Sequence, residues 1–336
     1  MKNVLWAASL SLACVTGAAA QSDFYQGKTI NIVVGFTPGG TYDQMARFYA
    51  RHLPRFLPGK PNVIVQNMPG AGSLIAATHM YNAAPRDGTA LGVLGGGTVW
   101  EAALGNPRAK YDPREFNWLV GKSRDNITCL VWHTSPIKTI QDVIAREISV
   151  GATGPGSRTV SFPRALNELV GTKFKIVSGY PGGNEITLAL EKGEVDGYCG
   201  WALGSLKQRA MNWYTEKKVR FLVQFAPQSD PELKDVPLAV DLAKTDEARQ
   251  IMDFLTSDAT LAWTTLTTPG VPADRVALLR TALTQILKDK DALAEADREK
   301  LEIDPVSGEE LQSLVQKLYA TPPATLDAIR RLNQGK

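Results

Sequence analysis

The chain has 336 residues, of which 44% are apolar and 21% charged, and its formal net charge is +3. This length exceeds the usual size of a single hydrophobic core, so two domains are the default expectation. The near balance of 37 basic and 34 acidic residues excludes the strongly basic footprint of a nucleic-acid-binding protein.

The first 20 residues have the pattern of a secretory signal. Lys2 precedes the apolar run VLWAASLSLACVTG, which is too short to span a bilayer, and an A-x-A cleavage pattern ends at Ala20. Lipoprotein cleavage at Cys14 is a less favoured alternative, because Ser11 stands where such sites usually carry Leu. We therefore expect an exported mature chain without a membrane-spanning segment.

The next hundred residues alternate between short β-branched runs and helical patterns. This alternation predicts parallel βαβ units and an α/β fold. Thr41 and Gln44 match a capping box at the start of the first helix, and Pro54 is expected to end it. The expected strands are 30–36, 63–66, 91–94 and 118–120, and the expected helices are 42–53 and 74–83.

The polar stretch 121–126 predicts a crossover, after which the α/β pattern restarts. We interpret the second block as a smaller domain, 123–224, inserted in a first domain made of 21–122 and 225–336. Beyond residue 240 the pattern is mainly helical, and these helices are expected to pack on the first sheet. The expected strands of the second block are 127–132, 148–152, 174–177, 195–200 and 220–225. One expected helix follows the turn 151–157 and ends at residue 170, and a second covers 185–192.

Two cysteines remain after the signal, Cys129 and Cys199. In an oxidising compartment they can pair if their Cα atoms lie within about 7 Å. Both lie in apolar strand-like runs, where buried free thiols are equally common, so the pairing stays open.

Four glycine-containing turns follow expected strands: GFTPGGT at 35–41, NMPGAGS at 67–73, GGGT at 95–98 and GATGPGS at 151–157. The start of a helix has unpaired N–H groups and a partial positive charge, and glycine gives an anion access to them. Each turn by itself could be a tight strand-to-helix connection without a ligand. Because the carboxyl ends of strands in open α/β sheets bind ligands, the recurrence favours an anionic ligand held between two domains, with Gly97 and Thr98 among its candidate contacts.

The motifs of several other sites are missing. The turn 151–156 has the glycine spacing of a P-loop, but Ser157 and Arg158 stand where Lys and Ser or Thr are needed. The three histidines are isolated, and HExxH, CxxC and GxSxG do not occur. We therefore expect no catalytic set, no metal and no cofactor. Of the carboxylates near the turns, Asp43 could cap a helix or shape a site, and Asp196 could support the fold or the site.

Together the stretches GFTPGGTYDQMAR, VIVQNMPGAGSLIAA, APRDGTALGVL, YDPREFNWL, GATGPGS, KGEVDGYCG and PGVPADRV closely resemble the extracytoplasmic substrate-binding proteins of tripartite tricarboxylate transporters, the Bug or TctC-type receptors. The resemblance covers essentially the whole mature chain from about Tyr25. It implies a two-lobed, type II-like periplasmic-binding-protein fold, in which each lobe is a mainly parallel sheet flanked by helices. It also implies a small organic carboxylate in the cleft.

The resemblance implies that main-chain amides, hydroxyls and bridging waters of three turns approach one carboxylate of the ligand. In this sequence these residues are Phe36, Thr37, Gly39, Gly40, Thr41, Asp43, Ala71, Gly72, Ser73, Gly156, Ser157 and Thr159.

The second lobe departs from the family pattern. Many relatives carry a Tyr-Lys-Gly segment where this chain has Tyr180-Pro181-Gly182, so a Lys that could meet a distal anion is missing. Arg158 is a candidate replacement, with an Arg that makes no ligand contact as the alternative. Trp201 either lines the cleft or belongs to the core.

The resulting hypothesis is a monomeric periplasmic receptor that binds a carboxylate without catalysis and delivers it to the subunits of a membrane permease. One alternative is a receptor that docks on a membrane sensor kinase. Another is an exported ester hydrolase, which would need Ser73 or Ser157 within reach of His79 or His133. The sequence does not identify the carboxylate.

Overall fold

The computed structural model describes residues 24–122, 126–153, 157–180 and 182–334. The signal expected at residues 1–20 lies outside this part of the chain. Within the described ranges, none of the helices combines the length and the apolar character needed to cross a membrane.

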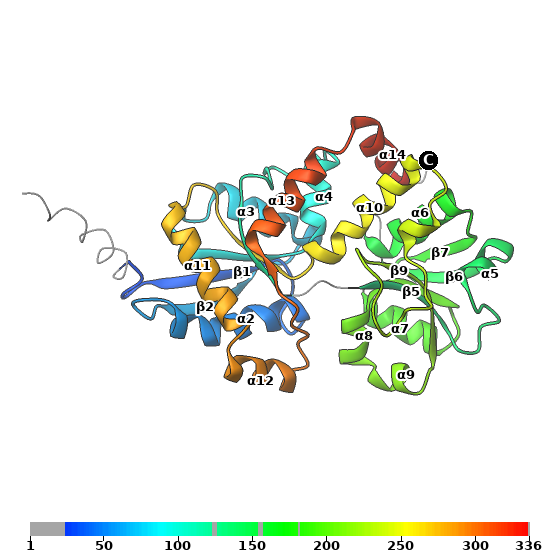
Figure 1. Ribbon diagram of the computed structural model, residues 1–336, viewed down its shortest axis with the longest axis horizontal. Helices are drawn as coiled ribbons and strands as arrows, with labels where there is room; N and C mark the ends of the chain where they lie inside the picture. Colours follow the sequence, from blue (N-terminus) through cyan, green and yellow to red (C-terminus); the bar gives the residue numbers. More distant parts are fainter. Residues whose placement is uncertain (1–23, 123–125, 154–156, 181, 335–336) are drawn as a thin grey trace, which may run out of the picture.

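Two β-sheets lie side by side with helices around each (Figure 1). The first sheet has six strands in the order β11-β4-β10-β3-β1-β2. Its strands are β1 (Thr29–Val34), β2 (Asn62–Asn67), β3 (Ala90–Leu94), β4 (Asn117–Gly121), β10 (Thr264–Thr267) and β11 (Val306–Ser307).

The second sheet has five strands in the order β7-β6-β8-β5-β9. Its strands follow one another in the sequence between β4 and β10, so this lobe is inserted in the other. They are β5 (Ile127–Trp132), β6 (Ile148–Ala152), β7 (Phe174–Ser178), β8 (Gly197–Ala202) and β9 (Val219–Phe225). The domain boundaries at 122/123 and 224/225 stay a prediction.

Both sheets are mixed: each contains three parallel neighbours, as the sequence predicts, and the remaining neighbouring strands pair antiparallel. In the first sheet β2, β1 and β3 are parallel neighbours, and in the second β7, β6 and β8 are. The strands that follow the two crossovers, β5 and β10, run against their neighbours. Helices cover both faces of the sheets, so β3 is buried at every position.

The crossovers bring the carboxyl edges of the two sheets together. β4 ends at Gly121 beside Thr264, the first residue of β10, and Thr264 also pairs with Leu94 at the end of β3. Ile127 begins β5 beside Ala202, where β8 ends. Six peptide units from residue 121 to residue 127 span at most about 20 Å. The edges at which β3 and β8 end therefore face the same space between the lobes.

The helices confirm the expected pattern with some differences. They are α2 (Thr41–Phe56), α3 (Leu74–Asn82), α4 (Gly97–Ala103), α5 (Ile140–Ala145), α6 (Arg158–Val170), α7 (Gly183–Glu191), α8 (Leu203–Arg209), α9 (Met211–Thr215), α10 (Asp246–Leu261), α11 (Ala273–Ile286), α12 (Lys290–Arg298), α13 (Gly308–Tyr319) and α14 (Pro323–Gln334), with 3₁₀ turns η1 (Ala71–Ser73) and η2 (Ala239–Leu242).

Two expectations for α2 are wrong. The helix begins at Thr41 with Gly40 as its N-cap, and no side-chain cap bond forms there. The Gly39 N–H donates instead to the Asp43 carboxylate at 2.9 Å, so Asp43 ties the residue before the N-cap to the first turn of the helix. At the other end α2 continues through Pro54 to Phe56, because Met45, Phe48, Tyr49 and Leu53 bury one face of the helix and outweigh the loss of one main-chain bond at Pro54.

The C-terminal helices divide between the two lobes. α11 packs on α2 and β4, and α13 packs on β4, as expected for helices on the first sheet. α14 packs on α6 and α10, and α10 also contacts α6 and β9. The expectation that all late helices pack on the first sheet is therefore wrong for α10 and α14.

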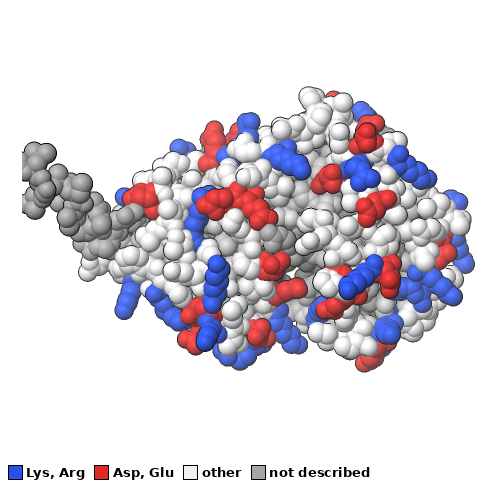
Figure 2. All heavy atoms as spheres, in the orientation of Figure 1, with Lys and Arg blue, Asp and Glu red and all other residues white. Residues whose placement is uncertain are grey.

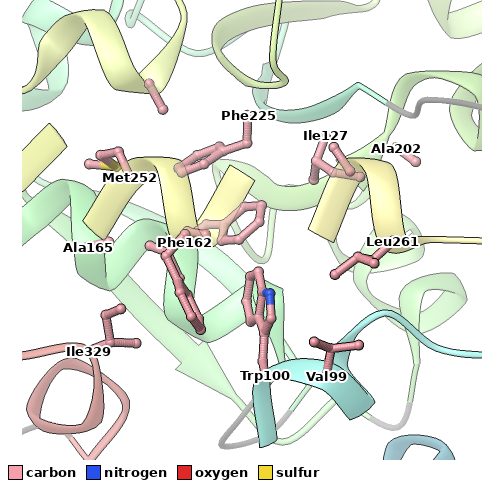
Figure 3. Packing of buried hydrophobic residues seen from close by; sticks show 14 of the residues in the cluster. Val99, Trp100, Ile127, Phe162, Ala165, Ala202, Phe225, Met252, Leu261 and Ile329 are labelled. Atoms are coloured by element: carbon pink, nitrogen blue, oxygen red, sulfur yellow. The ribbon is translucent and has the colours of Figure 1, made fainter. Parts of the chain in front are cut away.

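Trp100 on α4 packs between residues of both lobes (Figure 3). Its ring centroid lies 6.4 Å from that of Phe162 on α6 and 5.6 Å from that of Phe254 on α10. Phe162 stacks at 4.0 Å on Phe225, the last residue of β9, and the Trp100 indole N–H donates to Ser257 Oγ at 2.9 Å. One cluster of buried apolar residues thus continues from one lobe into the other.

A disulfide joins Cys129 on β5 to Cys199 on β8, across directly paired strand positions. It resolves the pairing that the sequence leaves open. Both cysteines are fully buried, so the bond ties two neighbouring strands inside the second lobe.

Candidate functional site

The turn after β1 presents main chain to the space between the lobes. Residues 37–40 are exposed, and Gly39 has a φ of +83° that glycine adopts readily. Asn67, the last residue of β2, donates from Nδ2 to the Phe36 carbonyl at 3.0 Å and to Asp43 Oδ1 at 2.9 Å. The turn is therefore tied to the neighbouring strand while residues 37–40 stay exposed.

Asp43 is buried and fully engaged within the protein. Besides the bonds from Gly39 and Asn67, its carboxylate accepts from Arg47 Nε at 2.8 Å and Arg47 Nη2 at 3.0 Å. Burial disfavours the charged carboxylate, but the hydrogen bonds from Arg47, Gly39 and Asn67 outweigh burial and hold the pKa of Asp43 below its usual value. These contacts favour site shaping over ligand contact for Asp43.

The turn after β2 has an unusual backbone. Gly70, Ala71, Gly72 and Ser73 all have positive φ values, and for Ala71 and Ser73 this conformation costs about 1–2 kcal/mol each. Packing and a hydrogen bond stabilise this unfavourable conformation of Ser73, because the residue is fully buried and its Oγ accepts from the Gly95 N–H at 3.2 Å. Ala71 and Gly72 remain exposed beside it.

The turn after β3 is the third turn that the first lobe contributes to the candidate site. Thr98 Oγ1 donates to the Gly95 carbonyl at 2.8 Å, and the Tyr111 hydroxyl donates to the Thr98 carbonyl. The Thr98 side chain thus closes its own turn, whereas Gly97 is half-buried. The ring of Phe36 lies over Gly95, within 3.0 Å of where a Cβ would be.

Three aromatic rings continue along the same edge. Phe36 stacks on Tyr42 with ring centroids 4.2 Å apart, and Tyr42 lies 4.2 Å from Trp263, the residue before β10. Trp263 has a φ of +60°, an uncommon value for a bulky residue. These rings form an apolar wall beside the first turn.

Hydroxyl groups line the turn after β6 in the second lobe. Thr153 Oγ1 donates to Ser157 Oγ at 2.9 Å, and Ser157 Oγ lies 2.6 Å from Thr159 Oγ1. Thr159 Oγ1 also accepts the Thr153 N–H at 3.0 Å. The predicted Gly156 lies outside the described residues. The three hydroxyls meet at the start of α6, where main-chain N–H groups are also available.

Gly200 on β8 packs against the main chain at the start of α6, next to this turn. It has a φ of +91°, and a Cβ there would lie 3.1 Å from the main-chain carbon of Arg158 and from the Thr159 nitrogen. Gly200 forms a β-bulge in β8: Cys199 pairs with Cys129 and Trp201 pairs with Thr128, and Gly200 between them has no partner on β5. Arg158 is half-buried at the first position of α6. Burial raises the pKa of the nearby Tyr198, and the Arg158 charge opposes that shift.

Two of the predicted ligand-binding residues lie away from the strand-to-helix turns. Asp196 precedes β8 and its Oδ2 accepts from Ser149 N and Oγ near the start of β6, so it lies at the opposite edge of the sheet. Trp201 is 5% exposed and packs against Tyr198 and Trp213, which places its ring in the core. Tyr180 does lie at the carboxyl edge, half-buried beside Gly151.

The two lobes touch beside the turn after β1. Gln208 on α8 donates to Gln44 Oε1 on α2 at 3.4 Å and to the Glu299 carbonyl at 3.3 Å. On the face shown in Figure 2, acidic and basic side chains are interspersed over both lobes.

The geometry is suited to binding. The Ser73 hydroxyl is buried under the turns after β1 and β3, which argues against it as the exposed nucleophile of an ester hydrolase. Among the residues that the structure describes, no group of three or more His, Cys, Asp or Glu side chains could hold a metal ion.

Two α/β lobes, one inserted in the other, whose strand-to-helix turns face one space are the architecture of a two-lobed solute-binding protein. A family model for the tripartite tricarboxylate transporter family receptor, TctC, matches residues 45–309. The chain belongs to this family.

The chain is also similar to individual known proteins. The protein described as UPF0065 in the gbd 5′ region of Cupriavidus necator is 29% identical over 256 residues, which are 69% of this chain and 71% of that protein. A TctC solute-binding protein from Polaromonas has 19% identity and a TM-score of 0.69 over 91% of this chain and 99% of its own.

Two further similar structures are described with bound carboxylates. MatC from Rhodopseudomonas palustris, with malate, has 23% identity and a TM-score of 0.63 over 90% of this chain and 99% of its own. Another R. palustris protein, with adipate, has 20% identity and a TM-score of 0.65 over 91% of this chain and 97% of its own. At these identities the likeness concerns the fold.

Sequence reasoning missed four residues that build the site: Gly35, Asn67, Thr153 and Gly200. Gly35, Asn67 and Thr153 lie inside the quoted turns, where glycine, amide and hydroxyl character was a usable signal. Gly35 packs on Ser73, and Asn67 and Gly200 contact neighbouring elements, and no local pattern reveals such contacts.

Proposed function

We propose that this protein is an exported solute-binding receptor that captures a small organic carboxylate between its lobes and delivers it to a tripartite tricarboxylate-type membrane permease. Membership of the TctC receptor family and the signal pattern at residues 1–20 support this proposal. The observation that carries it is the arrangement of strand-to-helix turns from both sheets around one space.

The chemistry of these turns suits a carboxylate. The exposed residues Thr37 and Gly40, next to the start of α2, and the start of α6 can offer N–H donors with a partial positive charge. The hydroxyls of Thr153, Ser157 and Thr159 add donors that can rotate toward an oxygen. We expect the ligand to be bound and released unchanged by a single copy of the chain in the periplasm.

Ligand binding is testable by calorimetry and thermal unfolding. The mature chain is unfolded and refolded to remove copurified ligand, and malate and adipate are titrated with their diamides as uncharged controls. A carboxylate at 100-fold its Kd should stabilise the protein by about 2.7 kcal/mol, whereas the diamides should not. Failure of every member of a broad carboxylate panel to shift the Tm of ligand-free, folded protein would contradict the proposal.

The turn of the second lobe provides a matched pair of variants. Thr159→Val removes one hydroxyl of the cluster at nearly constant shape and should weaken carboxylate binding. Thr281→Val changes a Thr on α11 whose hydroxyl bonds only its own helix, and should leave binding unchanged. Equal binding by both variants would argue against the second-lobe half of the site.

A further inference from the structure

The disulfide between Cys129 and Cys199 lies directly beside the β-bulge at Gly200. Cys199 pairs with Cys129 on β5, and Gly200 is the next residue of β8. On the other side of the bulge, the Thr128 hydroxyl donates to the Trp201 carbonyl at 2.9 Å. Two links between β5 and β8, one covalent and one a hydrogen bond, therefore enclose the bulge.

β5 is the strand that holds this part of β8 in register. Among the described residues, β8 pairs with β6 only at Gly197 and Tyr198, so the ladder to β6 ends before the bulge. Beyond that point α6 packs on β8, and its first turn lies against Gly200. Because a bulge leaves its extra residue out of the ladder, the position of Gly200 depends on the two flanking links to β5.

The bulge in turn supports the hydroxyl cluster of the second lobe. A Cβ at Gly200 would lie 3.1 Å from the Thr159 nitrogen, so the main chains of β8 and α6 pack together with little room for a side chain. Thr159 Oγ1 accepts the Thr153 N–H at 3.0 Å and lies 2.6 Å from Ser157 Oγ. A displacement of Gly200 would therefore move these hydroxyls together with the start of α6.

Both sulfurs are enclosed by the core. Cys129 and Cys199 are fully buried and belong to the apolar cluster that continues into the other lobe. Protein interiors are close-packed, and two separate thiols need more room than two bonded sulfurs. Breaking the disulfide would thus push β5 and β8 apart at the position next to the bulge.

We propose that the Cys129–Cys199 disulfide positions the second-lobe half of the ligand site by fixing the Gly200 bulge against the start of α6. Ligand affinity then depends on the oxidation state of this pair. The inference rests on the proposed receptor function and adds a redox-dependent element to the same site. Cys129 and Cys199 are positioning residues, because they act on the ligand only through Gly200 and α6.

The test compares ligand affinity with and without the disulfide in the mature chain. Oxidised wild type and Cys129→Ala/Cys199→Ala are titrated by calorimetry with malate, adipate and the other acids of the carboxylate panel. The variant should bind the same acid about fivefold or more weakly. Wild type refolded from urea with excess dithiothreitol should show the same loss. In that reaction dithiothreitol closes to its cyclic disulfide, and its two electrons and two protons convert the two cysteines to thiols.

Further measurements distinguish positioning from a purely structural role. Val131→Ala removes two methyl groups at a fully buried position of β5, paired with Gly197 and away from the bulge. It should lower the Tm and leave affinity unchanged. The amide resonance of Thr159 in the ligand-free protein should shift when the disulfide is lost and stay nearly constant in Val131→Ala. Thr128→Val, which removes the second link, should weaken binding, and more so without the disulfide than with it.

Two outcomes would overturn this inference and leave the receptor function standing. One is equal affinity of the oxidised protein, the reduced protein and the alanine variant. The other is an equal loss of affinity in Val131→Ala, because the loss would then follow from stability alone. Urea unfolding verifies the fold of each protein, and if the alanine variant does not fold, reduced wild type and Thr128→Val make the comparison. If oxidised wild type binds none of the carboxylates, the receptor proposal fails and this inference falls with it.

Discussion

The hydroxyl of Ser73 lies against the Cα of Gly35. A Cβ at residue 35 would fall 1.9 Å from Ser73 Oγ and 2.6 Å from Ser73 Cβ. We therefore expect Gly35→Ala to destabilise the protein by about 1–3 kcal/mol, because the fully buried Ser73 has no room to move. Carboxylate affinity should fall with it, since the turns after β1 and β2 are forced apart. Urea unfolding and calorimetry measure the two effects.

Removing the Ser73 side chain should rescue Gly35→Ala. Ser73 has a φ of +78°, which glycine adopts without strain, so Ser73→Gly alone loses mainly the bond to the Gly95 N–H. In a double-mutant cycle the Gly35→Ala/Ser73→Gly protein should be more stable than the sum of the single changes predicts. Strict additivity would show that the two residues do not compete for the same space.

Replacing Asp43 should loosen the turn after β1. Asp43→Asn leaves one acceptor oxygen for donors from Gly39, Asn67 and Arg47, and we expect a loss of about 1–3 kcal/mol together with weaker ligand binding. The pKa of Asp43 is lowered from 3.8, so its contribution is fully present above about pH 4 and is lost as the pH falls through the folded-state pKa. The stability difference between wild type and Asp43→Asn should therefore shrink below pH 3.8.

Asp196 supplies the matched control for this experiment. Its carboxylate also bonds a neighbouring strand, through Ser149, but at the edge away from the turns. Asp196→Asn should lower stability without changing carboxylate affinity. Weakened binding in Asp196→Asn would contradict the placement of the site at the carboxyl edges, and unchanged binding in Asp43→Asn would contradict the role of Asp43.

The sequence predicts the parts of this fold that depend on local patterns. Regular apolar runs locate β1 to β9 to within a few residues, and the glycine turns mark the strand ends that face the other lobe. β10 is missed because its four residues TTLT read as polar. In the structure Thr267 donates its hydroxyl to the Ala90 carbonyl, so a buried Thr is satisfied by a neighbour that is distant in sequence.

The site is less predictable because its geometry depends on contacts between elements. The expected strand 195–200 already places Asp196 at its amino end, away from the carboxyl edge, but nothing local to Trp201 shows that its ring packs on Trp213 in the core. The strained backbone at Ser73 follows from packing against Gly35 and Gly95. These are tertiary relationships, in which packing overrides what the residue types suggest singly.

Gly200 should prove as important for binding as the residues that touch the ligand. The first turn of α6 rests on its Cα, with Arg158 and Thr159 main-chain atoms 3.1 Å from the position of a Cβ. We expect Gly200→Ala to cost about 1–2 kcal/mol for its φ of +91° and in addition to displace the hydroxyl cluster, so that carboxylate affinity falls. Gly171→Ala is the matched control, because Gly171 at the other end of α6 has a φ of +88° and open space around it. It should lose similar stability and keep full affinity, as measured by urea unfolding and calorimetry on the same preparations. If both variants bind equally well, the start of α6 does not contact the ligand.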